Sequence, residues 1–181
     1  MKIHQISPQP LTFEIIESIL EDHIQLSLSD ESRKRIVDCK AFLDQKLAQH
    51  EGPIYGINTG FGALHDKSIS KSDLNRLQEN LVMSHACGVG REVPKEVVRL
   101  MLLLKIHALS LGKSGVQLQT VERLIALFNH NILPIVLEQG SLGASGDLAP
   151  LAHLFLPLIG HGEVYWKDKK VSKAEIISHA D

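Results

Sequence analysis

Residues 140–150 read Gly140-Ser141-Leu142-Gly143-Ala144-Ser145-Gly146-Asp147-Leu148-Ala149-Pro150, and small side chains dominate the stretch. Gly146 has no Cβ atom and therefore reaches backbone angles that are closed to other residues. Ala144 adds little bulk, and Ser145 carries a hydroxyl group that can leave. A run of small residues also fits an ordinary turn before a helix, and a bare Ala-Ser-Gly would favour that interpretation.

The order Ala144-Ser145-Gly146 allows the backbone to cyclise. The Gly146 amide nitrogen can attack the Ala144 carbonyl carbon with loss of one water, and Ser145 can then lose its hydroxyl group as a second water. The product is a methylidene-imidazolone ring, an electrophile that no ordinary side chain supplies. We interpret the tripeptide as the precursor of this ring.

The residues after the tripeptide predict a helix. Asp147 suits a first helical turn, and Pro150 is tolerated there. Four apolar residues follow at helical spacing: Leu151, Leu154, Phe155 and Leu158. The tripeptide is therefore expected at a helix N-terminus, where partial positive charge and unpaired amides would favour negative charge developing in the ring.

Three segments, in the same order along the chain, carry a resemblance to a known family. Their sequences are Tyr55-Gly56-Ile57-Asn58-Thr59-Gly60-Phe61-Gly62, Asn80-Leu81-Val82-Met83-Ser84-His85-Ala86-Cys87-Gly88 and Gly143-Ala144-Ser145-Gly146-Asp147-Leu148-Ala149-Pro150-Leu151-Ala152-His153. They resemble the tyrosine loop, the substrate-selectivity segment and the prosthetic-group motif of the histidine and aromatic amino acid ammonia-lyases. The resemblance is closest to the amino-terminal part of the histidine enzymes.

The resemblance implies a mainly α fold, a helical bundle of the ammonia-lyase and fumarase-aspartase-like type. Short loop and strand segments would precede the bundle. The pattern Val164-Tyr165-Trp166-Lys167-Asp168-Lys169-Lys170-Val171 itself predicts a small hairpin with a polar tip. We expect residues 1–112 to form an N-terminal region with the tyrosine loop, and residues 113–181 to begin the central helical region. Because family members are considerably longer, the chain is expected to be truncated.

The resemblance also assigns roles to individual residues. Tyr55 would be the base that removes a hydrogen from the carbon beta to the substrate carboxylate, and Ser84 with His85 would recognise an imidazole. Taken from the sequence alone, Tyr55 also fits a packed loop aromatic, and His85 fits a helix-end histidine bonded to a carbonyl group. The family context favours the functional roles.

Weaker assignments concern residues around these groups. Asn58 and Gly62 would shape the tyrosine loop, and Asp147 would orient groups during cyclisation. His153 follows the tripeptide by two helical turns, and it fits either a helix histidine with an internal partner or a residue that supports the site.

Other periodic stretches predict further elements. Residues 2–6 fit a strand, and a first helix is expected from about Thr12 to Leu20. A second helix is expected from Ser29 or Asp30 to about Gln49, and a third from Ser70 or Asp73 towards Gly88. Two more are expected, one that begins at Pro94 and one from Gln117 to Asn129. The residues from Val97 to Leu111 are apolar on nearly every side, which indicates burial against partners. Tyr55 is expected on a loop after a very short strand.

Composition excludes several classes of protein and site. The 181 residues carry a formal net charge of −2, without the basic excess that binding to nucleic acid would require. The spacing of the ten histidines and two cysteines matches no metal site, and Gly112-Lys113-Ser114 lacks the first glycine of a nucleotide-binding loop. Apolar stretches interrupted by charges and proline predict no membrane span, and two free thiols fit the cytoplasm.

The family resemblance implies a carbon-nitrogen lyase that eliminates ammonia from L-histidine to give urocanate, the first step of histidine breakdown. The family resemblance implies a homotetramer. Two alternatives remain open. The first is another enzyme with the same prosthetic group, either an aromatic amino acid ammonia-lyase or an aminomutase, and the second is a truncated helical fragment without activity.

Overall fold

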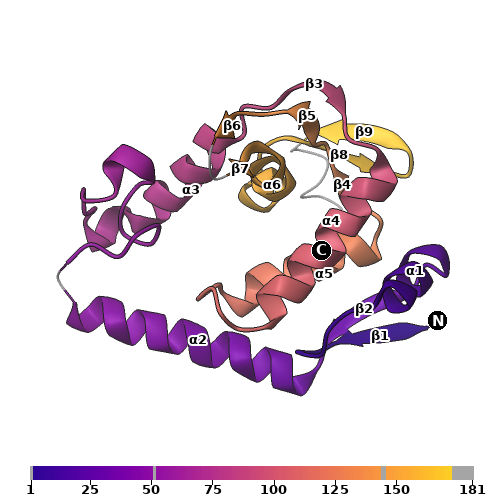
Figure 1. Ribbon diagram of the computed structural model, residues 1–181, viewed down its shortest axis with the longest axis horizontal. Helices are drawn as coiled ribbons and strands as arrows, with labels where there is room; N and C mark the ends of the chain where they lie inside the picture. The colour runs from indigo at the N-terminus through magenta and orange to yellow at the C-terminus, as the bar shows by residue number, and fades with distance from the viewer. Residues whose placement is uncertain (1, 51, 144–145, 173–181) are drawn as a thin grey trace. The chain divides into compact units, whose positions relative to one another are not determined.

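The structure is a computed structural model that describes residues 2–50, 52–143 and 146–172. α-Helices predominate in it, as predicted, and the strands are short (Figure 1). The described residues form two compact units. Unit 1 comprises residues 2–46, 94–133 and 164–171, and unit 2 comprises the remaining described residues.

Unit 1 contains most of the long helices. Its elements are β1 (Ile3–Ile6), α1 (Phe13–Glu21), β2 (Gln25–Leu28), α2 (Asp30–Gln49), α4 (Lys95–Ser110) and α5 (Leu118–Asn129). A small sheet of order β4-β8-β9 follows, with β4 at Leu133–Pro134, β8 at Glu163–Trp166 and β9 at Lys169–Ser172. α2, β4, β8 and β9 extend slightly past the boundary of the unit.

The two N-terminal strands pair in parallel, with Ile3 opposite Gln25 and Ile6 opposite Leu28. Asn129, the last residue of α5, holds this pair: its Oδ1 accepts the Leu26 amide at 2.8 Å, and its Nδ2 donates to the Leu26 carbonyl at 2.9 Å. The strand over residues 2–6 is thus confirmed. β2 was not predicted, because four residues carry little periodic signal and the strand depends on distant partners.

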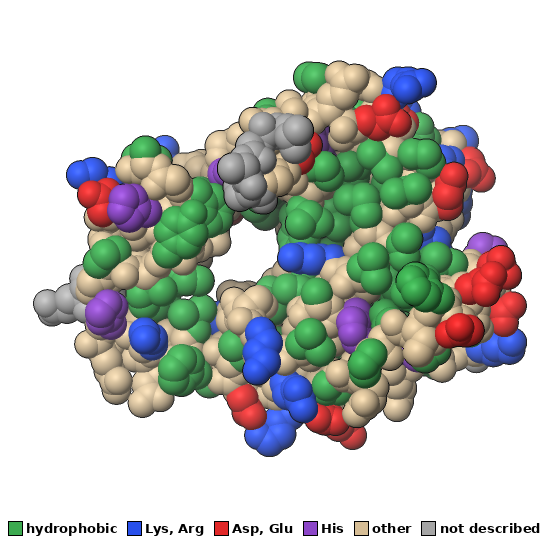
Figure 2. Space-filling view, viewed as in Figure 1, with side chains coloured by type: hydrophobic (Ala, Val, Ile, Leu, Met, Phe, Trp, Pro, Cys, Tyr) green, Lys and Arg blue, Asp and Glu red, His purple; other side chains and the backbone are tan. Residues whose placement is uncertain are grey.

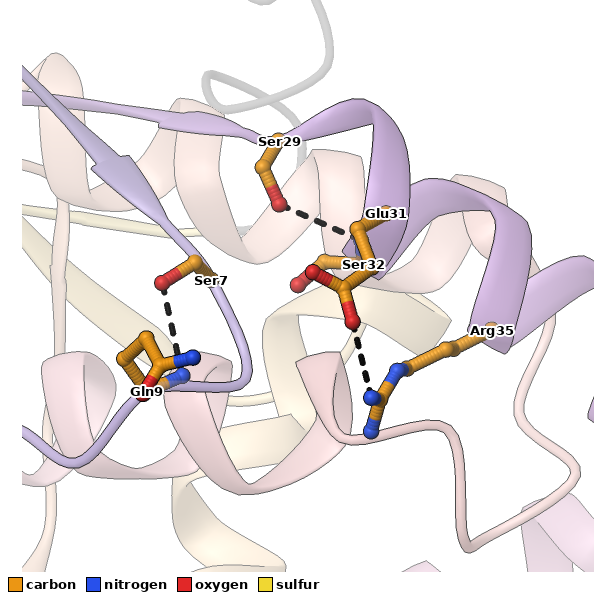
Figure 3. A network of polar contacts seen from close by, with 6 residues as sticks. All are labelled: Ser7, Gln9, Ser29, Glu31, Ser32 and Arg35. Carbon is orange, nitrogen blue, oxygen red and sulfur yellow. Dashed lines mark hydrogen bonds and ion pairs between the residues drawn. The ribbon is translucent and has the colours of Figure 1, made fainter.

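Polar side chains define the start of α2 (Figure 3). Ser29 Oγ accepts the Ser32 amide at 3.2 Å, which is an N-cap contact, and Glu31 pairs with Arg35 one turn later at 2.8 Å. Of the two predicted caps, Ser29 is therefore the residue that caps the helix, and Asp30 begins it.

The core of unit 1 lies between α4 and α5. Val98, Leu102 and Ile106 of α4 are fully buried, as are Val121 and Phe128 of α5. The opposite face of α4 stays open: Val97 is 41% exposed and Leu104 is 44% exposed. α4 is therefore buried along one side in this chain, whereas the sequence predicts burial on nearly every side.

The strands β8 and β9 form the predicted hairpin. Lys167 and Asp168 connect them, with φ angles of 48° and 61°. Two consecutive residues with positive φ are typical of the tight turn that matches the twist of two antiparallel strands.

Unit 2 holds shorter elements. They are η1 (Gly62–Leu64), η2 (Lys71–Asp73), α3 (Leu74–His85), β3 (Val89–Glu92), β5 (Leu137–Gln139), β6 (Leu142–Gly143), β7 (Gly146–Asp147), α6 (Ala149–Phe155) and η3 (Leu156–Ile159). β3 pairs with β5 and β6 with β7, both antiparallel. α6 packs against α3 and β5.

Buried side chains of unit 2 include polar ones. Val136, Ala149 and Leu154 are buried together with Asn58, Thr59 and His153. The tyrosine loop contains turns and no strand between residues 52 and 61, so the very short strand predicted there is wrong. In the part of the chain that the structure describes, every helix is too short or too polar to cross a membrane.

Candidate active site

The residues predicted for substrate recognition lie in the last turn of α3. Ser84 Oγ donates to the Leu81 carbonyl at 3.1 Å, and His85 Nδ1 lies 2.7 Å from the same oxygen. Ser84 Oγ and His85 Nδ1 are themselves 3.3 Å apart. One backbone carbonyl near the helix end therefore orients both side chains.

The Leu81 carbonyl decides the tautomer of His85. A carbonyl oxygen only accepts hydrogen bonds, so Nδ1 of His85 carries the proton. In a neutral ring Nε2 is then a free acceptor. The helix-end contact expected for a structural histidine is present, and it leaves the second nitrogen available for a ligand.

The Asn58 side chain connects residues of the tyrosine loop through hydrogen bonds to the backbone. Its Oδ1 accepts the Ile54 amide at 2.6 Å, and its Nδ2 donates to the Gly52 carbonyl at 3.2 Å. Thr59 Oγ1 accepts the Gly56 amide at 3.2 Å. These part-buried contacts bring the residues on both sides of Tyr55 together, and the shaping role of Asn58 stays a prediction. Asn58 also lines a pocket of about 320 Å³ with His50, Ser68 and Ser70, and neither Tyr55 nor His85 lines it.

Gln78 connects the loop to α3. Its Nε2 donates to the Ile57 carbonyl at 2.9 Å and to the Gly56 carbonyl at 3.3 Å. Gln78 precedes His85 by seven residues, which is about two helical turns, so the two residues lie on the same side of α3. The seven-residue spacing from His85 is the sequence signal that would have indicated a role for Gln78, which lies outside the three segments quoted above.

Phe61 brings the predicted base and the predicted recognition residue together. Its ring centroid lies 5.6 Å from that of Tyr55 and 5.4 Å from that of His85, and the second contact is edge-to-face. Tyr55 is 63% exposed. Figure 2 shows apolar side chains on the surface of the segment that leads into α3, where Tyr55, Phe61 and Leu64 are exposed. Phe61 belongs to the tyrosine-loop segment, and no local sequence pattern marks it as the residue that contacts His85.

Gly62 begins η1 and has a φ angle of 58°. Its carbonyl accepts the His65 amide at 3.1 Å, so it turns the chain directly after Phe61. A side chain at this position would meet no atom within 4 Å, and the requirement for glycine comes from the backbone angle.

The prosthetic-group motif differs from the prediction in its local structure. Ala144 and Ser145 lie outside the described residues, and Gly146 belongs to β7, with Gly143 of β6 opposite it. α6 begins only at Ala149, so the prediction that Asp147 lies in the first helical turn is wrong, and the predicted place of Ala144 and Ser145 stays a prediction. The φ angle of 97° at Gly146 is incompatible with a right-handed helix.

Asp147 lies two residues before α6, next to its N-cap residue Leu148. Its Oδ1 accepts the Ala149 amide at 2.9 Å, so the acid binds a free amide of the first turn without being part of it. A Cβ atom on Gly140 would collide with the Asp147 carboxylate. The chain thus needs glycine at 140 to let β5, β6 and β7 approach one another around Asp147.

His153 joins α6 to the segment after α3. Its Nε2 accepts the Gly88 amide at 3.0 Å, and the side chain is buried. Burial lowers the pKa of His153, and the nearby Asp147 carboxylate opposes part of that effect. Of the two roles open for His153, the structure thus shows a histidine with an internal partner, and that partner belongs to the recognition segment.

The predicted site residues fall into two groups within unit 2. Tyr55 and His85 both contact Phe61, and Ser84 lies next to His85, whereas Gly146 and Asp147 precede α6. Between described residues, no hydrogen bond or ring contact joins the first group directly to the second. Across residues 2–50, 52–143 and 146–172, no three acidic, histidine or cysteine side chains cluster as metal ligands would.

Comparisons with known proteins identify close relatives. The family model described as aromatic amino acid lyase matches residues 11–181. Histidine ammonia-lyase of Caldanaerobacter subterraneus is 45% identical over 180 residues, which are 99% of this chain and 35% of that protein. The enzyme of the same name from Deinococcus radiodurans is also 45% identical, over 96% of this chain and 33% of its own length. The chain therefore spans about a third of the length of these curated relatives.

Solved structures agree with the sequence comparison. Histidine ammonia-lyase from Trypanosoma cruzi is 31% identical, with a TM-score of 0.85 over 99% of this chain and 35% of that chain. Ergothionase from Treponema denticola, an ergothioneine-degrading enzyme, is 26% identical with a TM-score of 0.92 over 99% of this chain and 36% of that chain. Tyrosine aminomutase from Streptomyces globisporus is 31% identical with a TM-score of 0.87, over 98% and 33%.

Proposed function

Because the chain belongs to the aromatic amino acid lyase family, we propose that it carries part of the active site of a histidine ammonia-lyase. The reaction is elimination of ammonia from L-histidine to give urocanate, as the first step of histidine breakdown. The curated relatives at 45% identity are named histidine ammonia-lyases, which supports this choice of substrate.

The observation that carries the proposal is the contact of Phe61 with both Tyr55 and His85. A base and a ring-binding group must lie close together if one substrate molecule is to meet both. Tyr55 takes the proton from the carbon beside the imidazole ring of the substrate, and His85 holds that ring. The shared contact with Phe61 supports these two roles, because it keeps Tyr55 and His85 in the same part of unit 2.

The free Nε2 of His85 supports an imidazole as the bound ring. As an acceptor, it suits an N–H group, which the histidine side chain has and the phenylalanine ring lacks. A phenyl ring would leave the nitrogen without a partner in a desolvated site. The arrangement therefore favours histidine over apolar aromatic amino acids.

The described residues around the tripeptide fit a cyclised backbone. Gly143 lies opposite Gly146 in the β6 and β7 pair, and only two residues, Ala144 and Ser145, connect them. The positive φ angle of Gly146 is one that tight backbone closure requires and glycine tolerates. When formed, the methylidene-imidazolone would supply an electrophile for the substrate amino group. Asp147 holds the chain after the ring through the Ala149 amide.

A homotetramer in the cytoplasm completes the proposal. Tyr55 is largely exposed in the single chain, and a base that acts on a weakly acidic hydrogen needs a site from which water is excluded. Neighbouring subunits, and family segments that this chain does not contain, would provide that cover.

An aminomutase is the second candidate, because tyrosine aminomutase has the same fold over this region. The two enzymes differ in product. A lyase releases ammonia and urocanate, whereas an aminomutase returns the amine to the neighbouring carbon. Detection of a beta-amino acid from L-histidine would favour the aminomutase.

Ser145→Ala tests the proposed function in the full-length protein. The methylidene group cannot form without the serine hydroxyl group, so we expect urocanate production to fall by about a hundredfold to a thousandfold or more, the scale typical of a group that stabilises the transition state. Intact mass should show the unchanged protein two waters lighter than its sequence and the variant without this deficit. Equal activity of the two proteins would refute the mechanism.

A further inference from the structure

The imidazole of His153 is held in one orientation by a backbone group far away in sequence. An amide N–H only donates, so Nε2 of His153 is unprotonated where it accepts the Gly88 amide. In the neutral ring the proton is therefore on Nδ1. This is the same tautomer as in His85, but here Nε2 is already engaged.

Glycine at position 88 allows the His153 ring to come close to the backbone. A Cβ atom at this position would lie 2.7 Å from Nε2 of His153 and 3.3 Å from Cβ of Leu137. The chain just after α3 is therefore confined between α6 and β5. Gly88 follows His85 by three residues, so this confinement also fixes the position of the last turn of α3.

α6 is tied at a second point, near its start. Asp147 binds the Ala149 amide, and Asp147 directly follows Gly146 of the predicted ring precursor. His153 lies one turn after Ala149 on the same helix. One short helix thus connects the residues next to the tripeptide with the segment that carries Ser84 and His85.

The His153 ring is uncharged at neutral pH, and this keeps its hydrogen bond to the Gly88 amide intact. Burial lowers the pKa of His153 below its ordinary value of 6.5 and outweighs the opposing influence of Asp147. The neutral ring is the form that can accept the Gly88 amide. In a protonated ring, Nε2 of His153 would carry a hydrogen that points at the N–H group of Gly88, and the hydrogen bond would be lost.

We propose that His153 is a positioning residue for substrate recognition: its Nε2 holds the Gly88 amide and thereby sets the place of Ser84 and His85 relative to Gly146. The inference rests on the proposed function for the meaning of that recognition. The hydrogen bond itself can be tested independently of any activity.

The matched pair His153→Gln and His153→Asn tests the proposal in the full-length protein. The glutamine carbonyl oxygen reaches about as far as Nε2, whereas the asparagine side chain is one carbon shorter and leaves the Gly88 amide unpaired. We expect His153→Asn to raise KM for L-histidine about tenfold with kcat changed less than about threefold, the scale of one lost hydrogen bond. His153→Gln should restore KM to within about threefold of the unchanged protein.

Hydrogen exchange supplies a readout besides activity. Exchange at the Gly88 amide, followed in peptides from residues 86–90, should be faster in His153→Asn and protected in His153→Gln. The same two substitutions at the exposed His161 of unit 2 are the control, and they should change neither KM nor exchange. Intact mass should remain two waters below the sequence mass in every variant.

Several results would overturn the proposal. KM unchanged in His153→Asn, or equal loss in the two variants, would show that His153 only fills space. Loss of the mass deficit would show that it acts in ring formation instead of recognition. If the unchanged protein forms no urocanate, the proposed function fails, and unequal exchange at Gly88 would still establish the hydrogen bond.

Discussion

At the residue scale, the two histidines near the site differ in which nitrogen has a backbone partner. His85 uses Nδ1 for the Leu81 carbonyl, whereas His153 uses Nε2 for the Gly88 amide. His85 therefore keeps its Nε2 acceptor free for a ligand, whereas the Nε2 acceptor of His153 is already occupied. Residue type alone contains none of this information.

His85→Leu tests the assignment of the free nitrogen. Removing the acceptor should raise KM for L-histidine by about tenfold to a hundredfold, because the imidazole N–H of the substrate loses its partner on desolvation. The apolar leucine should at the same time improve the ratio of activity on L-phenylalanine to activity on L-histidine. Steady-state kinetics with both substrates measure the change, and an unaltered ratio would speak against recognition by His85.

At the element scale, α3 carries both a residue that supports the tyrosine loop and the residues proposed for substrate recognition. Gln78 donates to the tyrosine loop, and about two turns later His85 contacts Phe61. A helix keeps such residues in register because each turn advances by about 5.4 Å along a rigid axis. The loop and the recognition residues therefore depend on one element.

Gln78→Glu tests this dependence with an isosteric change. The carboxylate cannot donate to the carbonyl groups of Gly56 and Ile57, so the loop should loosen. We expect faster hydrogen exchange in peptides covering residues 52–61 and a fall in kcat of about tenfold, because Tyr55 loses its place. Asn75→Asp, the same kind of change at an exposed position of α3, is the control. Equal exchange in the two variants would contradict the role of Gln78.

At the scale of the whole molecule, three half-buried or buried histidines make stability depend on pH. Burial lowers the pKa of His4, His107 and His153 below 6.5, and the charge of His4 adds to the effect on His107. Nδ1 of His107 is buried and has no hydrogen-bond partner within the described residues. Protonation in the folded state is therefore unfavourable at these positions.

The sign of the pH dependence follows from these lowered values. Above pH 6.5 the histidines are neutral in both states and the free energy of unfolding is at its full value. Below pH 6.5 the unfolded chain binds protons first, so stability falls as the pH drops through the lowered folded pKa values. Urea unfolding between pH 7.5 and pH 5 measures the slope. The double variant His4→Gln/His107→Gln should show a shallower slope, and an equal one would contradict this origin.

Much of the secondary structure could be predicted, since helix signals are local. The cap at Ser29, the apolar spacing in α5 and the hairpin at Lys167 and Asp168 depend on residues a few positions apart. The short strands β2, β3 and β5 could not be predicted, because each is defined by a partner elsewhere in the chain. The start of α6 was misplaced because the pattern of apolar residues did not reveal the positive φ angle of Gly146.

The predictions of the prosthetic ring and of imidazole recognition come from the sequence alone, because ring formation would join neighbouring backbone atoms of Ala144, Ser145 and Gly146, and because Ser84 and His85 are adjacent. Only the tertiary structure decided that Phe61 joins Tyr55 to His85 and that His153 holds the Gly88 amide. Contacts between residues tens of positions apart depend on how helices pack, and a local pattern carries no record of them.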